Sequence, residues 1–142
     1  MRLIECVPNF SEGRDMSVIT AIAKVVSDTD GVSLLNVDPG AAANRTVITF
    51  AGTPEGVCEA AFRAAEKAAQ LIDMSKQHGT HPRIGATDVL PLVPISGVTL
   101  EECAEMARNL AKRMADELAI PCYCYESAAF RPEVSNLAVC RI

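Results

Sequence analysis

The stretch 32-VSLLNVDPGAAANRTVITFA-51 decides the fold of this chain. Its two aliphatic runs, Val32–Val37 and Thr46–Ala51, are typical of β-strands. The turn formers Asp38-Pro39-Gly40 close the first run, and the small residues 41–44 form a loop before the second. Two strands joined directly, with no helix between them, pair antiparallel, because a parallel pair needs a long crossover. The stretch therefore predicts a hairpin.

The segments before the hairpin predict a strand and a helix. Residues 2–7 are rich in aliphatic side chains and suit a first strand, which the turn formers of residues 8–13 end. Asp15 can cap the next element. Apolar residues at helical spacing then predict a helix that runs to about Ser27, where Asp30-Gly31 breaks the pattern.

After the hairpin, the chain predicts a long helix and then a strand. Thr53 supplies an N-cap hydroxyl, and Pro54 suits the first helical position. The predicted helix runs from Pro54 to about Met74, and its many alanines favour close packing on a sheet. A polar loop follows, and then a strand over about Thr87–Val93.

The last third of the chain predicts one further helix and one further strand. Thr99 and Glu102 have the spacing of a capping box, in which each side chain bonds the other residue's amide. The helix that they begin is expected to run to about Ala119. Pro121 opens the strand-like run CYCYE, and residues 127–142 show no clear period.

The expected order is β-α-β-β-α-β-α-β. Its first six elements match an α+β split β-α-β (ferredoxin-like) plait, with the helices on one face of a mainly antiparallel sheet. The remaining helix and strand form an extra C-terminal unit. The alternative is a three-layer fold with a largely parallel sheet, and the direct hairpin favours the plait.

Length and composition set the class of protein. With 142 residues, 49% apolar and 22% charged, the chain is expected to be one globular domain with a real core. A net charge of −5 argues against general nucleic-acid binding. The N-terminus becomes polar too soon for a signal peptide, and no apolar run has transmembrane length. A cytoplasmic protein with no membrane partner is expected.

The six cysteines do not predict a disulfide framework or a metal site. None belongs to a Cys-x-x-Cys pair, and neither histidine has zinc-finger spacing from any of them. Free cysteine behaves as a small buried hydrophobe. We therefore expect reduced, structural thiols and no bound metal.

The loop within residues 74–95 carries the strongest candidates for chemistry. It holds both histidines of the chain, His78 and His81, together with Lys76 and Arg83. A histidine titrates near neutrality and can move a proton, and Pro82 stiffens the backbone of His81. The guanidinium of Arg83 suits a carboxylate. The alternative is a solvated loop whose histidines have no function, which fits His78 better than His81.

Three further residues, at the ends of predicted strands, are candidates. Asp38 could orient an imidazole or hold a substrate amine, or it could be only a turn former. Arg45 could bind a substrate carboxylate or end a strand in a surface ion pair. Asn9 could be an amide ligand or part of a turn. The glycine-rich nucleotide motifs and the elbow of serine hydrolases are absent from the sequence.

Three separate motifs carry a resemblance to a known family. They are ECVPNFSEG at 5–13, ANRTVITFAG at 43–52 and LIDMSKQHGTHPRIGATDVLPLVPISGVTLEEC at 71–103. Together they resemble the N-terminal subdomain of glutamate formiminotransferase, the transferase part of formiminotransferase-cyclodeaminase. The resemblance covers nearly the whole chain in collinear order. It implies that residues 1–142 form one such subdomain.

The resemblance implies an activity and a set of site residues. The activity is transfer of a formimino group from N-formiminoglutamate to N5 of tetrahydrofolate, the co-substrate, in histidine breakdown and one-carbon metabolism. The family's catalytic base maps onto His81, and its aspartate at the end of the second strand maps onto Asp38. Asn9, Arg45, Lys76 and Arg83 are then the candidates to hold the two substrates. The resemblance also implies a homodimer and no metal.

The sequence departs from the family pattern at several points. Thr80 stands where the family has a glutamate before the catalytic histidine, and Ala43 where bacterial members often have a histidine. The family's second subdomain and a folate-contacting stretch resembling GEYE-x-L are not in these 142 residues. An alternative function is therefore a non-catalytic folate-binding or dimerising module that kept only the fold.

Overall fold

A computed structural model describes residues 1–72, 86–120, 123–126 and 138–141 of the chain. Three helices and seven strands lie in these residues. In chain order they are β1 (Leu3–Cys6), β2 (Asn9–Phe10), α1 (Met16–Ser27), β3 (Val32–Gly40), β4 (Arg45–Gly52), α2 (Pro54–Leu71), β5 (Thr87–Ser96), α3 (Leu100–Leu118), β6 (Tyr123–Glu126) and β7 (Ala138–Arg141).

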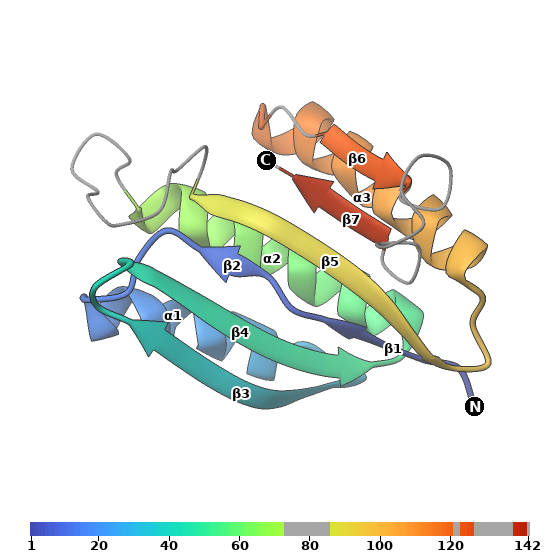
Figure 1. Ribbon diagram of the computed structural model, residues 1–142, viewed down its shortest axis with the longest axis horizontal. Coiled ribbons are helices and arrows are strands. Elements are labelled where there is room, and N and C mark those ends of the chain that lie inside the picture. The colour runs from blue at the N-terminus through green and yellow to red at the C-terminus, as the bar shows by residue number, and fades with distance from the viewer. Residues whose placement is uncertain (73–85, 121–122, 127–137, 142) are drawn as a thin grey trace.

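The seven strands form one sheet in which every described pairing is antiparallel. β1 and β2 follow each other along one line in the middle of the sheet, with β4 on one side and β5 on the other (Figure 1). β3 forms one edge and β6 the other. The predicted plait is therefore confirmed, and β6 with β7 adds a hairpin beyond β5.

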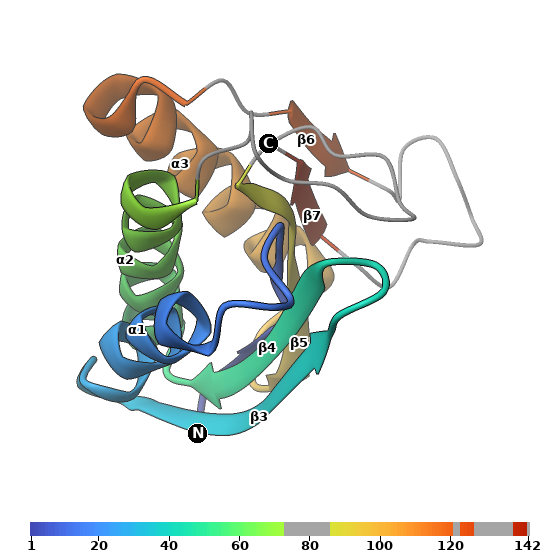
Figure 2. The same ribbon diagram turned by 90° about the vertical axis from the view of Figure 1, so that its left-hand side faces the viewer.

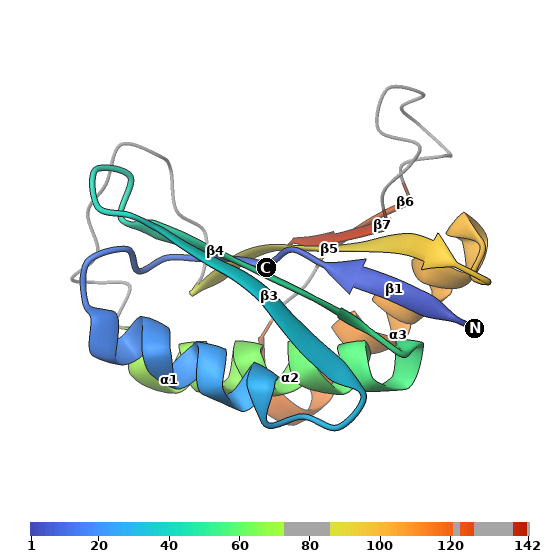
Figure 3. The same ribbon diagram turned by 90° about the horizontal axis from the view of Figure 1, so that it is seen from below.

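The three helices of the described residues all cover one face of the sheet, and none of them lies against the other face, which we call the uncovered face (Figures 2 and 3). Side chains of β1, β2, β4 and β5 meet the helices in a single buried core, whose largest members are fully enclosed. α2 contributes mostly alanines, which allow the helix backbone to approach the sheet closely, as the sequence predicted. None of the helices in the described residues is long and apolar enough to cross a membrane.

The predicted helix starts are confirmed. The Asp15 carboxylate accepts the Ser17 amide at 3.0 Å, and the Thr53 hydroxyl accepts the Gly56 amide at 3.1 Å. Thr99 and Glu102 make both bonds of the capping box, each 3.0 Å long. These contacts satisfy amides that the first helical turn leaves without an intrahelical partner.

The hairpin is longer than the sequence predicts, and this changes the environment of Asp38. β3 continues through Gly40 and pairs as far as Gly40 opposite Arg45, so Asp38 lies within a strand and not in a turn. Pro39 is tolerated there because β3 is an edge strand, where a missing amide proton breaks no ladder bond. The prediction that the first strand of the hairpin ends at Val37 was wrong.

Other boundaries also differ. Asn9 and Phe10, predicted as turn residues, pair with both β4 and β5, since Pro8 interrupts the strand without ending its line. α2 ends at Leu71, and not at about Met74, because Ile72 takes an extended conformation and is itself buried. β5 runs on to Ser96. β7 falls in the segment for which the sequence showed no period.

Candidate functional site

A line of residues crosses the uncovered face of the sheet near the tip of the β3–β4 hairpin. Asp38 on β3 lies opposite Val47 on β4, Val47 lies opposite Asn9 on β2, and Asn9 lies opposite Val89 on β5. Directly opposed residues of antiparallel strands point to the same face. On β4, Thr46 and Ile48 are buried against the helices, so Val47 and its neighbours in the line belong to the uncovered face.

These residues line an open hollow of about 230 Å³, formed by Asn9, Asp38, Gly40, Ala43, Arg45 and Val47. The structure thus brings together three of the residues predicted from sequence: a carboxamide, a carboxylate and a guanidinium. Gly40 and Ala43 add little bulk and leave room between the polar groups. Sequence analysis did not single out Gly40 or Val47 as lining residues, because their place in the hollow follows from strand register.

A hydrogen bond between Gly13 and Asn44 joins the two loops beside the hollow. Asn44 is 2% exposed, has a positive φ of 52°, and its side-chain oxygen accepts the Gly13 amide at 2.8 Å. A Cβ atom at Gly13 would overlap the Gly40 carbonyl and the backbone of Arg45, so only glycine allows this approach. The contact fixes the backbone of two residues that line the hollow.

Glu12 and Thr46 strengthen the same junction. Glu12 is 7% exposed, and its carboxylate accepts hydrogen bonds from the amides of Arg14 and Asp15 at 3.1 and 3.0 Å. The Thr46 hydroxyl donates to the Glu12 carbonyl. Sequence analysis did not single out these residues. Their polar types resembled ordinary turn chemistry, and only the structure reveals that they are buried.

The other predicted site residues, Lys76, His81 and Arg83, lie outside the described residues, as does His78. β5 begins at Thr87, shortly after them in the chain, and pairs with β2 at Phe10 and Asn9. Their roles stay predictions.

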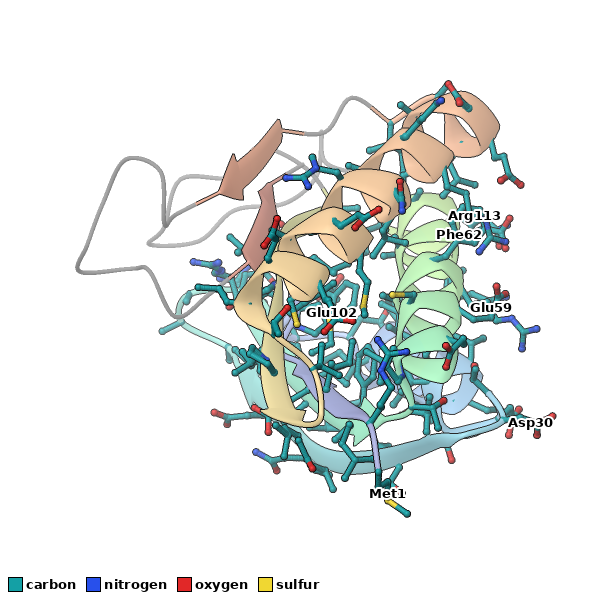
Figure 4. The ribbon with its side chains drawn as sticks, turned by 90° about the vertical axis from the view of Figure 1, so that its right-hand side faces the viewer. Met1, Asp30, Glu59, Phe62, Glu102 and Arg113 are labelled. Atoms are coloured by element: carbon teal, nitrogen blue, oxygen red, sulfur yellow. The ribbon has the colours of Figure 1, made fainter. Side chains whose placement is uncertain are left out.

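A second hollow, of about 280 Å³, lies on the helix side between α2 and α3. It is lined by Pro54, Glu55, Cys58, Met106, Asn109, Leu110 and Arg113. Arg113 donates to Glu59 at 2.8 Å and to Glu117 at 3.1 Å, and its guanidinium carbon lies 3.7 Å from the centroid of the Phe62 ring (Figure 4). This guanidinium is therefore held by neighbouring helices and is an element of packing.

Three of the six cysteines behave as predicted for structural thiols. Cys6, Cys58 and Cys103 are free, and burial raises the pKa of each thiol, to about 11 for Cys58. Such thiols are poor nucleophiles at neutral pH. Within the described residues, no cluster of three or more His, Cys, Asp or Glu side chains could hold a metal ion.

Comparison with known proteins identifies the family of the chain. A family model described as the formiminotransferase domain, N-terminal subdomain, matches residues 3–142, which include the whole described sheet and all three helices. The chain belongs to this family. The resemblance drawn from the three motifs is thereby confirmed.

Several formiminotransferase relatives align with most of the chain. Formimidoyltransferase-cyclodeaminase of Sus scrofa is 54% identical over 90% of this chain and 24% of its own length. The Mus musculus protein of the same name is 51% identical over 99% of this chain and 26% of its own length. Glutamate formimidoyltransferase of Streptococcus pyogenes serotype M1 is 45% identical over 99% of this chain and 47% of its own length. The chain thus spans between a quarter and a half of these relatives.

Proposed function

We propose that this chain carries the formimino-donor side of a glutamate formimidoyltransferase, which transfers the formimino group of N-formiminoglutamate to N5 of tetrahydrofolate. The observation that carries the proposal is the hollow, in which strand register gathers Asn9, Asp38 and Arg45 on the uncovered face of the sheet. Membership of the formiminotransferase family supports the reaction type. Tetrahydrofolate is the co-substrate, and histidine breakdown in the cytoplasm is the proposed setting.

The proposed reaction needs one proton to be moved. N5 of tetrahydrofolate attacks the formimino carbon and forms the new C–N bond, and the N5 proton passes to His81. The tetrahedral intermediate then expels the amino group of glutamate, which takes that proton from His81. A single imidazole can serve as base and then as acid, because an ordinary histidine titrates near neutrality. No metal or redox cofactor takes part in this scheme.

The charged residues have proposed binding roles. N-formiminoglutamate and the glutamyl tail of the folate both carry carboxylates, which guanidinium and ammonium groups bind well. Arg45 is proposed to hold a carboxylate from its place in the hollow, with Asn9 donating or accepting a hydrogen bond beside it. Lys76 and Arg83 are proposed for the remaining carboxylates. Residues 1–142 are proposed to act as one subdomain within a homodimer.

The first experiment compares formimino transfer by this chain with transfer by His81→Ala. His78→Ala is the matched control, because it removes the other histidine, three positions away. We expect kcat for His81→Ala to fall by about 10²–10⁴, the usual contribution of a general acid–base group, while His78→Ala stays near the parent. Equal activity in all three proteins would exclude the role of His81.

A second candidate function is a folate-binding or dimerising module without activity. The observation in its favour is the departure from the family pattern at Thr80, next to the proposed base His81. Tetrahydrofolate binding by calorimetry, with no turnover in the parent chain, would select this module over the transferase.

A further inference from the structure

The hollow on the sheet contains two opposite charges at a defined separation. Asp38 and Arg45 stand on neighbouring antiparallel strands, two positions apart in register, because Asp38 lies opposite Val47 and Arg45 opposite Gly40. Such diagonal neighbours have Cβ atoms about 7–8 Å apart or slightly less. The ion pairs among the described residues do not include one between Asp38 and Arg45. A ligand with a cation and an anion a few bonds apart fits between them.

The two possible donors differ at the group that would face Asp38. A formimino group is an amidine, a strong base that carries a positive charge at neutral pH and presents N–H donors. A formyl group is a neutral amide, and its carbonyl oxygen can only accept hydrogen bonds. Both donors carry the same glutamate carboxylates. A carboxylate such as Asp38 therefore attracts the first donor and repels the carbonyl of the second.

From this geometry we propose that Asp38 determines donor specificity: it binds the formimino cation and disfavours formyl donors. This inference rests on the proposed function of the site and adds to it. Arg45 binds a carboxylate that both donors share, so it contributes affinity and no discrimination. Gly40 stands opposite Arg45 on β3 and leaves the space between the two charges open, since it has no side chain to fill it.

The expected size of the effect follows from the exposure of Asp38. Its side chain is exposed on the edge strand, so water screens its attraction for the ligand. A fully enclosed carboxylate would discriminate by far more. We therefore expect Asp38 to favour the formimino donor by about tenfold.

The test measures kcat/KM for N-formiminoglutamate and for N-formylglutamate with the same chain. In Asp38→Asn the ratio of the two values is expected to fall by about tenfold, because the amide can donate to a formyl oxygen. Asp38→Glu keeps the charge and should retain most of the preference. Arg45→Gln should lower both values by the same factor and leave the ratio unchanged.

Asp116→Asn is the matched control, since it makes the same change at an exposed position of α3, on the opposite side of the sheet. Circular dichroism confirms that each variant is folded. If Asp38→Asn slows both donors equally, the specificity role is overturned while the transferase function stands.

Binding separates the two proposals when the chain does not turn over either donor. Calorimetry then compares the two compounds as ligands of the parent and of Asp38→Asn. A preference for N-formiminoglutamate that Asp38→Asn removes would support the specificity role although transfer has failed. Equal binding of both compounds by the parent would overturn it.

Discussion

Of the two hollows, one on the uncovered face of the sheet and one between α2 and α3, the smaller one on the sheet is the candidate site. The helix-side hollow is the larger, yet its guanidinium at Arg113 is already held by Glu59, Glu117 and the ring of Phe62. In the sheet-side hollow, Asp38 and Arg45 form no ion pair with one another. The candidate site is therefore chosen by the polar groups that strand register gathers in it, and not by its volume.

Strand β4 contributes side chains both to the core and to the sheet-side hollow. Its alternate residues Thr46, Ile48 and Phe50 are buried against the helices, whereas Arg45, Val47 and Thr49 belong to the uncovered face. Because successive side chains point to opposite faces, one strand serves the core and the hollow at once. Substitutions on the two faces should therefore have separable effects on stability and on binding.

The largest expected effect is on the core face. Phe50→Ala should lower the free energy of unfolding by about 3–5 kcal/mol, because the ring is fully buried and its loss leaves a cavity. Thr49→Ala, one residue away on the uncovered face, should change it by less than about 1 kcal/mol. Urea denaturation measures both. Equal losses would show that the uncovered face also carries the stability of the fold.

A smaller effect is expected on the reactivity of Cys58, which lines the helix-side hollow. Burial raises the pKa of Cys58 from 9.0 to about 11, so its thiolate fraction near pH 8 is about a hundredfold lower than that of an ordinary cysteine. Alkylation of Cys58, followed by mass spectrometry, should be slow by about that factor. The chain unfolded in urea gives the reference rate. Fast labelling of the folded chain would make this hollow a reactive site.

The next largest effect is expected at the hydrogen bond between Gly13 and Asn44, beside the sheet-side hollow. Asn44→Ala should cost about 1–3 kcal/mol, since it leaves the buried Gly13 amide without its acceptor and places alanine at a positive φ. Asn44→Gly loses the same hydrogen bond but tolerates the backbone angle. Its loss should therefore be smaller. If both variants unfold at the same urea concentration, the positive φ contributes nothing.

The sequence predicted most of the fold because its signals were local. Asp15, Thr53 and Thr99 had capping positions that the structure confirms, and the direct hairpin of residues 32–51 determined the order of the first strands. The hairpin's length was not predictable, because Asp38-Pro39-Gly40 is typical of a turn and only the edge position of β3 allows it in a strand.

The sequence predicted which residues could form the candidate site, but not how they are arranged in space. In the sequence, Asn9, Asp38 and Arg45 each had both a binding and a purely structural interpretation. The pairing of β2, β3 and β4 places all three residues at one hollow. Glu12 and Asn44 were missed as supports, since burial of a polar residue in a loop is set by contacts far along the chain. Strand register and burial are tertiary properties that no local pattern encodes.

The smallest expected effect concerns the paired charges of the helix side. The hydrogen bond from Arg113 lowers the pKa of Glu59 below its ordinary value of 4.5, with a further contribution from Arg63. A carboxyl group whose pKa is lower in the folded state stabilises the fold above its unfolded pKa, and this stabilisation is lost as pH falls through the folded value. Both side chains are partly exposed, so the contribution is about 0.5–1 kcal/mol.

Glu59→Gln should therefore lower the free energy of unfolding at pH 7 by that amount, and the difference from the parent should shrink as falling pH protonates the parent carboxyl. Glu105→Gln is the control, because Glu105 is exposed on α3 and takes part in none of the ion pairs among the described residues. Urea denaturation from pH 3 to pH 7 measures the difference. A difference between Glu59→Gln and the parent that stays constant with pH would mean that Glu59 acts through packing. In that case the ion pair between Glu59 and Arg113 would not be a difference between the helix-side hollow and the candidate site on the sheet.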